Sequence, residues 1–185
     1  ALATAPAAAA VAVVRISGSK AFEIVGRVVR TKRAAAKLRD RVAVLGEAHD
    51  GARRVDRVLV LPMRGPRSYT GEDVIEIQCH GSPVVVSRIL SLVRRAGARD
   101  ASPGEFTRRA VLNGKIALVE AEAVNDLIRA ATPDAADAAL LGFDSALRLR
   151  VDEIRRDLIS VTAELEAVLE FPEEDLDSYD AAAAR

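Results

Sequence analysis

The first two thirds of the chain alternate between short runs rich in Val and Ile and longer amphipathic stretches. Helices are predicted at residues 19–29 and from Ser82–Pro83, a capping residue followed by a first-turn Pro, up to Gly97. A shorter helix opens at Ser102–Pro103 and ends at Asn113–Gly114. The Val- and Ile-rich runs, each bounded by Gly, Pro or Ser, predict four β-strands, at residues 11–17, 42–47, 55–63 and 73–80. This alternation predicts a mixed α/β domain.

The pattern changes after Ile116, where stretches of Ala, Leu, Glu and Arg replace the strand-like runs. Residues 118–131 predict one helix that ends before Pro133. Further on, one long helix is predicted, because apolar residues recur in an a/d heptad pattern: Leu140, Leu147, Ile154, Val161 and Val168, with Val151, Leu158 and Leu165 between them. A single helix cannot bury such a seam, so we expect it to pack in a bundle or against a second copy. Otherwise the fragment exposes an apolar stripe. The helices are too few to close a bundle, which predicts that the chain is a fragment of a longer protein.

One predicted strand has two contrasting faces. Side chains alternate along a strand, which gives one apolar face and one polar face: Ile75, Ile77 and Cys79 against Glu76, Gln78 and His80. Periodicity alone leaves metal binding, catalysis and ordinary solvation open for the polar face. The two histidines and one distant cysteine have no metal-ligand spacing, so we expect no metal site and a structural role for His80.

Arg15 is the second unusual position. It shares a strand face with Val11, Val13 and Ser17, so a guanidinium extends a mostly apolar row. An unpaired buried guanidinium is costly, so Arg15 either reaches water or meets a carboxylate or an anionic ligand. Glu76, on the polar face of another strand, is an eligible partner.

Charge is unevenly distributed although the formal net charge is zero. Residues 1–67 hold 14 Lys/Arg against 5 Asp/Glu, whereas residues 151–180 hold 2 against 11. The basic part is either a set of solvated faces or a surface for an anionic ligand or RNA. The single cysteine excludes an internal disulfide, and no apolar run reaches the length of a membrane span. These features predict a cytoplasmic protein without a membrane segment.

Gly114–Lys115 is the nearest approach to a nucleotide-binding loop. Such a loop needs a Gly five positions before the Gly and a Ser or Thr after the Lys, but the chain has Arg109 and Ile116 there. No nucleoside-triphosphate site is therefore expected in this chain. Lys115 projects from the predicted turn, where it is free to meet an anion.

Three long runs resemble the N-terminal portion of the MnmE (TrmE) family of tRNA-modification GTPases. They are VAVVRISG at residues 11–18, SYTGEDVIEIQCHGSP at 68–83 and PGEFTRRAVLNGKIALVEAEAVNDLIRA at 103–130. FPEEDLD at 171–177 resembles the family's segment at the end of the first long helix of its helical domain. The resemblance covers nearly the whole chain.

The resemblance implies the domain organisation. Residues 1–116 are expected to form an α/β (α+β) domain similar to the tetrahydrofolate-binding domain of glycine-cleavage aminomethyltransferases. This domain is expected to homodimerise and to bind a 5-formyl-tetrahydrofolate-type one-carbon donor. Residues 117–185 are expected to be the first helices of an all-α helical domain. The GTPase domain, with GTP, Mg²⁺ and K⁺, is expected outside this chain.

The resemblance also implies a function and a site. With a flavin-dependent partner, GidA/MnmG, the family builds an aminomethyl-type group on C5 of the wobble uridine of certain tRNAs. Three folate contacts of the family match Arg15, Glu76 and Lys115, with Glu76 expected on the pterin, and no catalytic residue is expected in this chain. One departure concerns the ligand mouth, where Ala7–Ala10 replaces a loop containing Gly and Arg.

Two other functions remain open. One is a stand-alone aminomethyltransferase-like folate enzyme, which a phosphate-binding loop further along the protein would exclude. The other is a non-catalytic helical assembly module whose folate pocket no longer works.

Overall fold

The computed structural model describes residues 1–143 and 145–170. The chain forms two compact units, residues 1–121 and a second unit that begins at Glu122.

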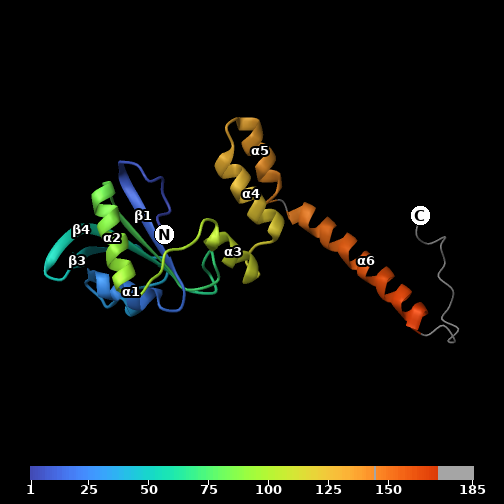
Figure 1. Ribbon diagram of the computed structural model, residues 1–185, viewed down its shortest axis with the longest axis horizontal. Coiled ribbons are helices and arrows are strands. Elements are labelled where there is room, and N and C mark those ends of the chain that lie inside the picture. Colours follow the sequence, from blue (N-terminus) through green and yellow to red (C-terminus); the bar gives the residue numbers. More distant parts are fainter. Residues whose placement is uncertain (144, 171–185) are drawn as a thin grey trace. The chain divides into compact units, whose positions relative to one another are not determined.

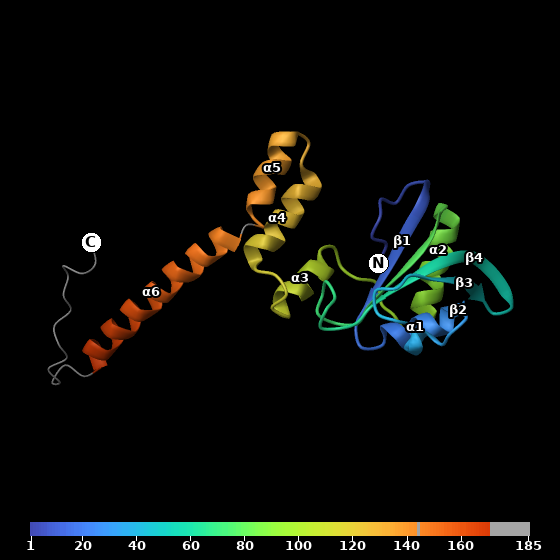
Figure 2. The same ribbon diagram turned by 180° about the vertical axis from the view of Figure 1, so that it is seen from behind.

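The first unit is built on one five-stranded antiparallel sheet (Figure 1). The strands are β1 (Ala9–Ser17), β2 (Val29–Thr31), β3 (Val44–Asp50), β4 (Arg53–Met63) and β5 (Val74–Gly81). Their order is β1-β5-β4-β3-β2, so β1 and β2 form the two edges. Figure 2 shows β3 and β4 running side by side as a hairpin. The sequence predicted four of these strands; β2 has only three residues and directly continues a helix, so it gave no alternation to recognise.

Three α-helices and one 3₁₀ turn accompany the sheet. They are α1 (Ala21–Val28), η1 (Ala35–Lys37), α2 (Pro83–Arg95) and α3 (Glu105–Leu112). Ser82 precedes α2 and Pro83 is its first residue, which confirms the predicted start. α3 begins at Glu105, two residues later than predicted, because Gly104 adopts a left-handed φ of +71°. The Glu105 carboxylate then accepts a hydrogen bond of 2.8 Å from the Ser102 backbone N–H.

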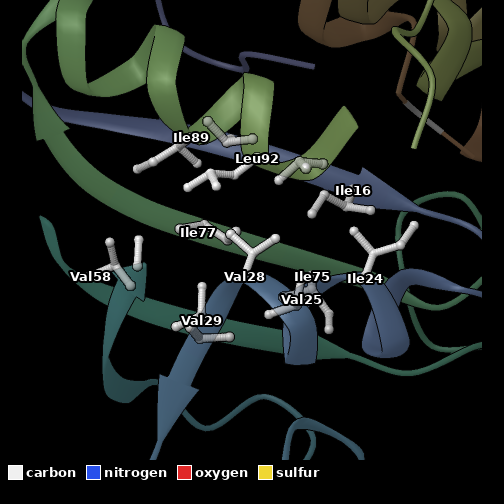
Figure 3. Close-up of a cluster of buried hydrophobic side chains, with 14 of the residues drawn as sticks. Ile16, Ile24, Val25, Val28, Val29, Val58, Ile75, Ile77, Ile89 and Leu92 are labelled. Atoms are coloured by element: carbon white, nitrogen blue, oxygen red, sulfur yellow. The ribbon is translucent and has the colours of Figure 1, made fainter. Parts of the chain in front are cut away.

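Helices α1 and α2 cover the same face of the sheet, and their apolar side chains meet those of the strands in one core (Figure 3). Fully buried members include Val14 of β1, Ile75 and Ile77 of β5, Ile89 of α2 and Val60 of β4. The core is almost entirely aliphatic, because the chain has only six aromatic residues. Apolar burial of this kind is the main stabilising contribution to the domain.

The other face of the sheet is exposed in part and carries two kinds of row. Backbone register aligns the apolar row Leu45, Leu59 and Val13 across β3, β4 and β1, with Gln78 of β5 between the last two. Leu45 and Leu59 are 55% and 41% exposed. The next row along the strands is Leu61, Glu76 and Arg15. We call this surface the open face.

The remaining helices are α4 (Leu118–Arg129), which crosses from the first unit into the second, α5 (Pro133–Leu141) and α6 (Ser145–Glu170). Thr132 caps α5, where its hydroxyl accepts a hydrogen bond from the Ala135 N–H. The predicted single long helix from Leu140 is wrong, because Leu140 belongs to α5. Gly142 follows α5 so close to α4 that a Cβ there would lie 2.5 Å from the Ala123 Cβ.

On α6, which Figure 1 draws as one unbroken helix, the heptad seam is an exposed apolar stripe in the single chain. Its exposed members are Val151, Ile154, Leu158, Val161 and Leu165. The side chains of Leu147 and Val168, and the FPEEDLD segment, lie outside the described residues. None of the helices described is both long and apolar enough to cross a membrane.

Candidate functional site

Arg15 and Glu76 form an ion pair on the open face. The two residues are direct neighbours on β1 and β5, so their side chains leave the sheet together. Arg15 donates from Nε and Nη2 to the same oxygen of Glu76, Oε1, at 2.8 and 2.7 Å. The guanidinium also lies 5.9 Å from the ring centroid of Phe106 on α3. Of the alternatives left open for Arg15, the structure shows a carboxylate partner, and that partner is Glu76.

The pair leaves one carboxylate oxygen available. Both contacts from Arg15 fall on Oε1, and Oε2 of Glu76 has no hydrogen-bond partner among the described residues. The Glu76 side chain is only 12% exposed. A partly buried, ionised oxygen is a strong acceptor for N–H donors of a ligand. Arg15 holds this carboxylate in place and offsets part of its charge.

Lys115 lies in the turn that ends α3. Its backbone N–H bonds the Ala110 carbonyl at 2.8 Å, and Gly114 takes a left-handed φ of +65°. The aliphatic part of Lys115 packs on Gly71, where a Cβ would lie 3.1 Å from its Cγ. Its ammonium group has no hydrogen-bond or ion-pair partner in the part of the chain that the structure describes. The structure thus leaves the Lys115 charge available for an anion.

The loop of residues 68–72 connects the turn of Lys115 to the end of β1. Asn113 donates from Nδ2 to the Thr70 carbonyl at 2.6 Å, and the Thr70 and Ser17 hydroxyls lie 2.8 Å apart. Ser17 is two residues from Arg15 on the same strand face. Thr70 is fully buried, and it is one of two buried polar side chains among the described residues, with Ser68. The structure therefore brings Arg15 and Glu76 into contact and ties Lys115 to them through this loop.

An ionic chain holds the same loop against α3. Arg109 donates to Glu72 at 2.7 Å and to Glu105, and Arg99 also donates to Glu105. Ser17 donates to the same oxygen of Glu72 at 2.8 Å. Hydrogen bonds from Arg99, from the Ser102 N–H and from Arg109 hold the pKa of Glu105 well below its usual range. α3 and the loop are thereby fixed to each other by charge-assisted hydrogen bonds.

No sequence pattern predicted a role at this site for the following five residues: Ser17, Thr70, Glu72, Arg109 and Asn113. Only one signal was available, the i,i+4 spacing of Glu105 and Arg109 on a predicted helix. The Ser17–Thr70 and Ser17–Glu72 contacts join residues 53 and 55 positions apart, and no local pattern predicts them.

A cavity of about 350 Å³ opens beside Arg15 at the β1 edge of the sheet. Its wall combines apolar side chains such as Ile24 and Phe106 with charged ones such as Lys20 and Arg109. Its volume falls in the range of small-molecule sites, at roughly 300–1,000 Å³. Glu76 and Lys115 do not line it. The cavity therefore shares only Arg15 with the predicted site.

The chain matches two family profiles in succession. The profile described as "GTP-binding protein TrmE N-terminus" covers residues 1–115, and the "MnmE helical domain" profile covers residues 118–185. The chain belongs to the MnmE (TrmE) family. This confirms the resemblance and favours it over the stand-alone aminomethyltransferase among the alternatives.

Relatives named tRNA modification GTPase MnmE agree with the family assignment. The proteins of Thermotoga sp. strain RQ2 and Alkaliphilus metalliredigens are 44% and 45% identical to the chain over 94% and 96% of its length. That of Symbiobacterium thermophilum is 44% identical over 96% of the chain. The aligned part amounts to only 38–39% of these relatives. The chain thus spans less than two fifths of the MnmE proteins that it matches.

Proposed function

We propose that this chain is the N-terminal part of a GTP-hydrolysing tRNA-modification enzyme and that it binds a one-carbon folate of the 5-formyl-tetrahydrofolate type. In this proposal GTP, Mg²⁺ and K⁺ belong to a GTPase domain outside the chain. The intact enzyme acts in the cytoplasm with a flavin-dependent GidA/MnmG partner on C5 of the wobble uridine of tRNA. The names of the relatives support the GTPase and tRNA parts of this proposal.

The observation that carries the folate proposal is the orientation of the Glu76 carboxylate. Oε1 is occupied by Arg15, whereas Oε2 is available to a ligand. A pterin presents adjacent N–H donors, and an ionised carboxylate oxygen accepts such donors well. Arg15 and Lys115 supply cations that suit the carboxylates of a glutamate tail or a pterin carbonyl. The donor set of the site therefore fits a reduced folate.

The proposed homodimer has a candidate surface in the open face. Leu45 and Leu59 are large apolar side chains that are about half exposed there, and they lie in the row next to the Arg15–Glu76 row. Contiguous exposed apolar side chains commonly mark interfaces. A second copy on this face would bury the apolar row and exclude water from the neighbourhood of Glu76.

Calorimetric titration of 5-formyl-tetrahydrofolate into the wild-type protein and into Glu76→Gln tests the folate proposal. We expect affinity to fall about 10- to 100-fold, because a hydrogen bond to a charged group contributes roughly 1.5–3 kcal/mol. Gln78→Ala is the matched control, since Gln78 lies two residues along the same strand on the same face. Equal affinity in wild type and Glu76→Gln would overturn the assignment of Glu76.

A further inference from the structure

A cluster of cations occupies the edge of the first unit that lies furthest from β1 in the sheet order. The segment of residues 30–41 contains six exposed cations and one carboxylate, that of Asp40. The cations are Arg30, Lys32, Arg33, Lys37, Arg39 and Arg41. We call these six residues the basic edge. They follow one another from β2 through η1 to the loop before β3.

The carboxylate within the segment does not neutralise the basic edge. Asp40 is only 18% exposed, and its oxygens accept hydrogen bonds from the Arg64 backbone N–H at 2.7 Å and from Arg67 at 3.4 Å. The charged side-chain groups of Lys32, Lys37 and their neighbours Arg33 and Arg39 have no ion-pair or hydrogen-bond partner among the described residues. The excess positive charge is therefore exposed to solvent.

Most other arginines of the same unit, in contrast, form an ion pair with a carboxylate. Arg94, Arg95 and Arg99 each have a carboxylate partner at 2.5–3.0 Å. A surface that serves solubility alone intersperses the two signs of charge, as this second group does. Clustered cations without neighbouring carboxylates instead produce a positive field that attracts a polyanion.

The backbone of the basic edge is held against the domain. Ala35 and Leu38 are buried, and the Arg41 N–H bonds the Pro62 carbonyl at 2.7 Å. Arg64 donates to the Ala36 carbonyl at 2.7 Å, and its guanidinium lies 4.0 Å from the ring centroid of Phe22. The cations are thus presented from an ordered loop, which limits the conformational entropy lost on binding.

The chemistry of the basic edge favours RNA over a membrane. Insertion into a lipid surface needs several exposed apolar side chains. Among the described residues, Val42 is the only large exposed apolar side chain directly next to residues 30–41. Residues 30–41 contain no Phe, Tyr, Trp or His, so stacking of bases on aromatic side chains is not available along the segment. Arg and Lys without aromatic residues suit phosphate contacts. We propose that the basic edge binds the phosphate backbone of a helical stem of tRNA.

This inference rests on the proposed role in tRNA modification, but it concerns a different surface from the folate site. The basic edge begins at β2, whereas Arg15 and Glu76 lie on β1 and β5 at the other end of the sheet order. Failure of one proposal therefore leaves the other testable.

Charge reversal in the intact protein that carries this chain tests the proposal. The variant combines Lys32→Glu, Arg33→Glu and Lys37→Glu, and binding to a tRNA transcript is measured by fluorescence anisotropy over a salt series. We expect at least about tenfold weaker binding at ~100 mM salt, and a log Kd against log salt slope lower by about 2 to 3, one per lost phosphate contact. The matched control carries Arg150→Glu, Arg155→Glu and Arg156→Glu on α6, which changes the net charge equally.

The outcomes separate the alternatives. The proposal holds if the control stays within about twofold of wild type and the reversal variant still binds 5-formyl-tetrahydrofolate normally. Alanine at the same three positions should give a smaller loss in the same direction. Equal losses in the reversal variant and the control, or no loss in either, would overturn it. Loss of binding to phosphatidylserine vesicles with unchanged tRNA binding would also overturn it, in favour of a membrane surface.

Discussion

The two faces of the sheet in the first unit differ in what their side chains do. The face under α1 and α2 is a continuous aliphatic core in which Val60, Ile75 and Ile77 are fully buried. The open face alternates an exposed apolar row with the Arg15–Glu76 row. Successive residues of one strand thus lie on different faces, since Ile75 and Ile77 point into the core and Glu76 between them lies on the open face. The covered face stabilises the domain, and the open face is the surface on which we propose that recognition takes place.

The largest expected effect is on the covered face. Ile77→Ala should lower the free energy of unfolding by about 2–5 kcal/mol, because it leaves a cavity in a fully packed region. Folate affinity of the folded protein should remain within about twofold, since the Ile77 side chain points away from Glu76. Urea denaturation followed by circular dichroism, together with calorimetric titration, measures both. A loss of affinity with unchanged stability would reverse the assignment of the two faces.

A substitution on the open face should weaken association and leave stability almost unchanged. Leu59→Asp places a charge in the exposed apolar row, and two-fold symmetry would place it on both sides of a dimer interface. We expect dissociation of the proposed dimer, by about 100-fold in Kd, with little change in the melting temperature. Sedimentation velocity over a concentration series measures the change.

Leu112→Asp provides the control for the dimer prediction. Leu112 is 72% exposed on α3 and does not belong to the sheet. Its substitution should leave the association unchanged. A wild-type protein that remains monomeric at all concentrations would contradict the proposed role of the open face.

A smaller effect is expected at the loop that ties Lys115 to the open face. In Gly71→Ala the new Cβ would lie 3.1 Å from the Lys115 Cγ, at a backbone φ of +78°. We expect roughly tenfold weaker folate binding, since positional errors of this size commonly weaken a preorganised site. Gly51→Ala is a matched control, because its φ of +60° imposes similar strain and no atom lies within 4 Å of the new Cβ. Equal losses in the two variants would show that strain, and not contact with Lys115, is responsible.

Much of the open face could be predicted from the sequence because it follows from local alternation. Two-residue periodicity separated Arg15 and Glu76 from the buried residues of their own strands. Antiparallel pairing of β1 and β5 then places the two side chains next to each other on the open face. The break between α5 and α6 was missed because the heptad spacing continues through Leu140. Periodicity also does not report the close approach of Gly142 to Ala123, where the chain leaves α5.

The support of the site could not be predicted, for a different physical reason. Ser17, Thr70 and Glu72 are small or polar residues at strand ends and in a loop, where hydrogen bonding and not burial of an apolar stripe determines the structure. Such contacts join distant segments and leave no periodic trace. The family resemblance predicted Lys115 as a site residue, whereas only the structure shows that its aliphatic part packs on Gly71.

The smallest effect concerns Cys79, which belongs to the covered face. Its thiol is buried and donates to the Ala12 carbonyl, and burial raises its pKa to about 11. Because the thiolate is the reactive form, only about one thiol in a thousand is reactive at pH ~8. We therefore expect the folded chain to resist a disulfide-exchange reagent at that pH, and to react fully after denaturation. Rapid labelling of Cys79 in the folded protein would mean that the covered face opens to solvent, and the contrast between the two faces would fail at that strand.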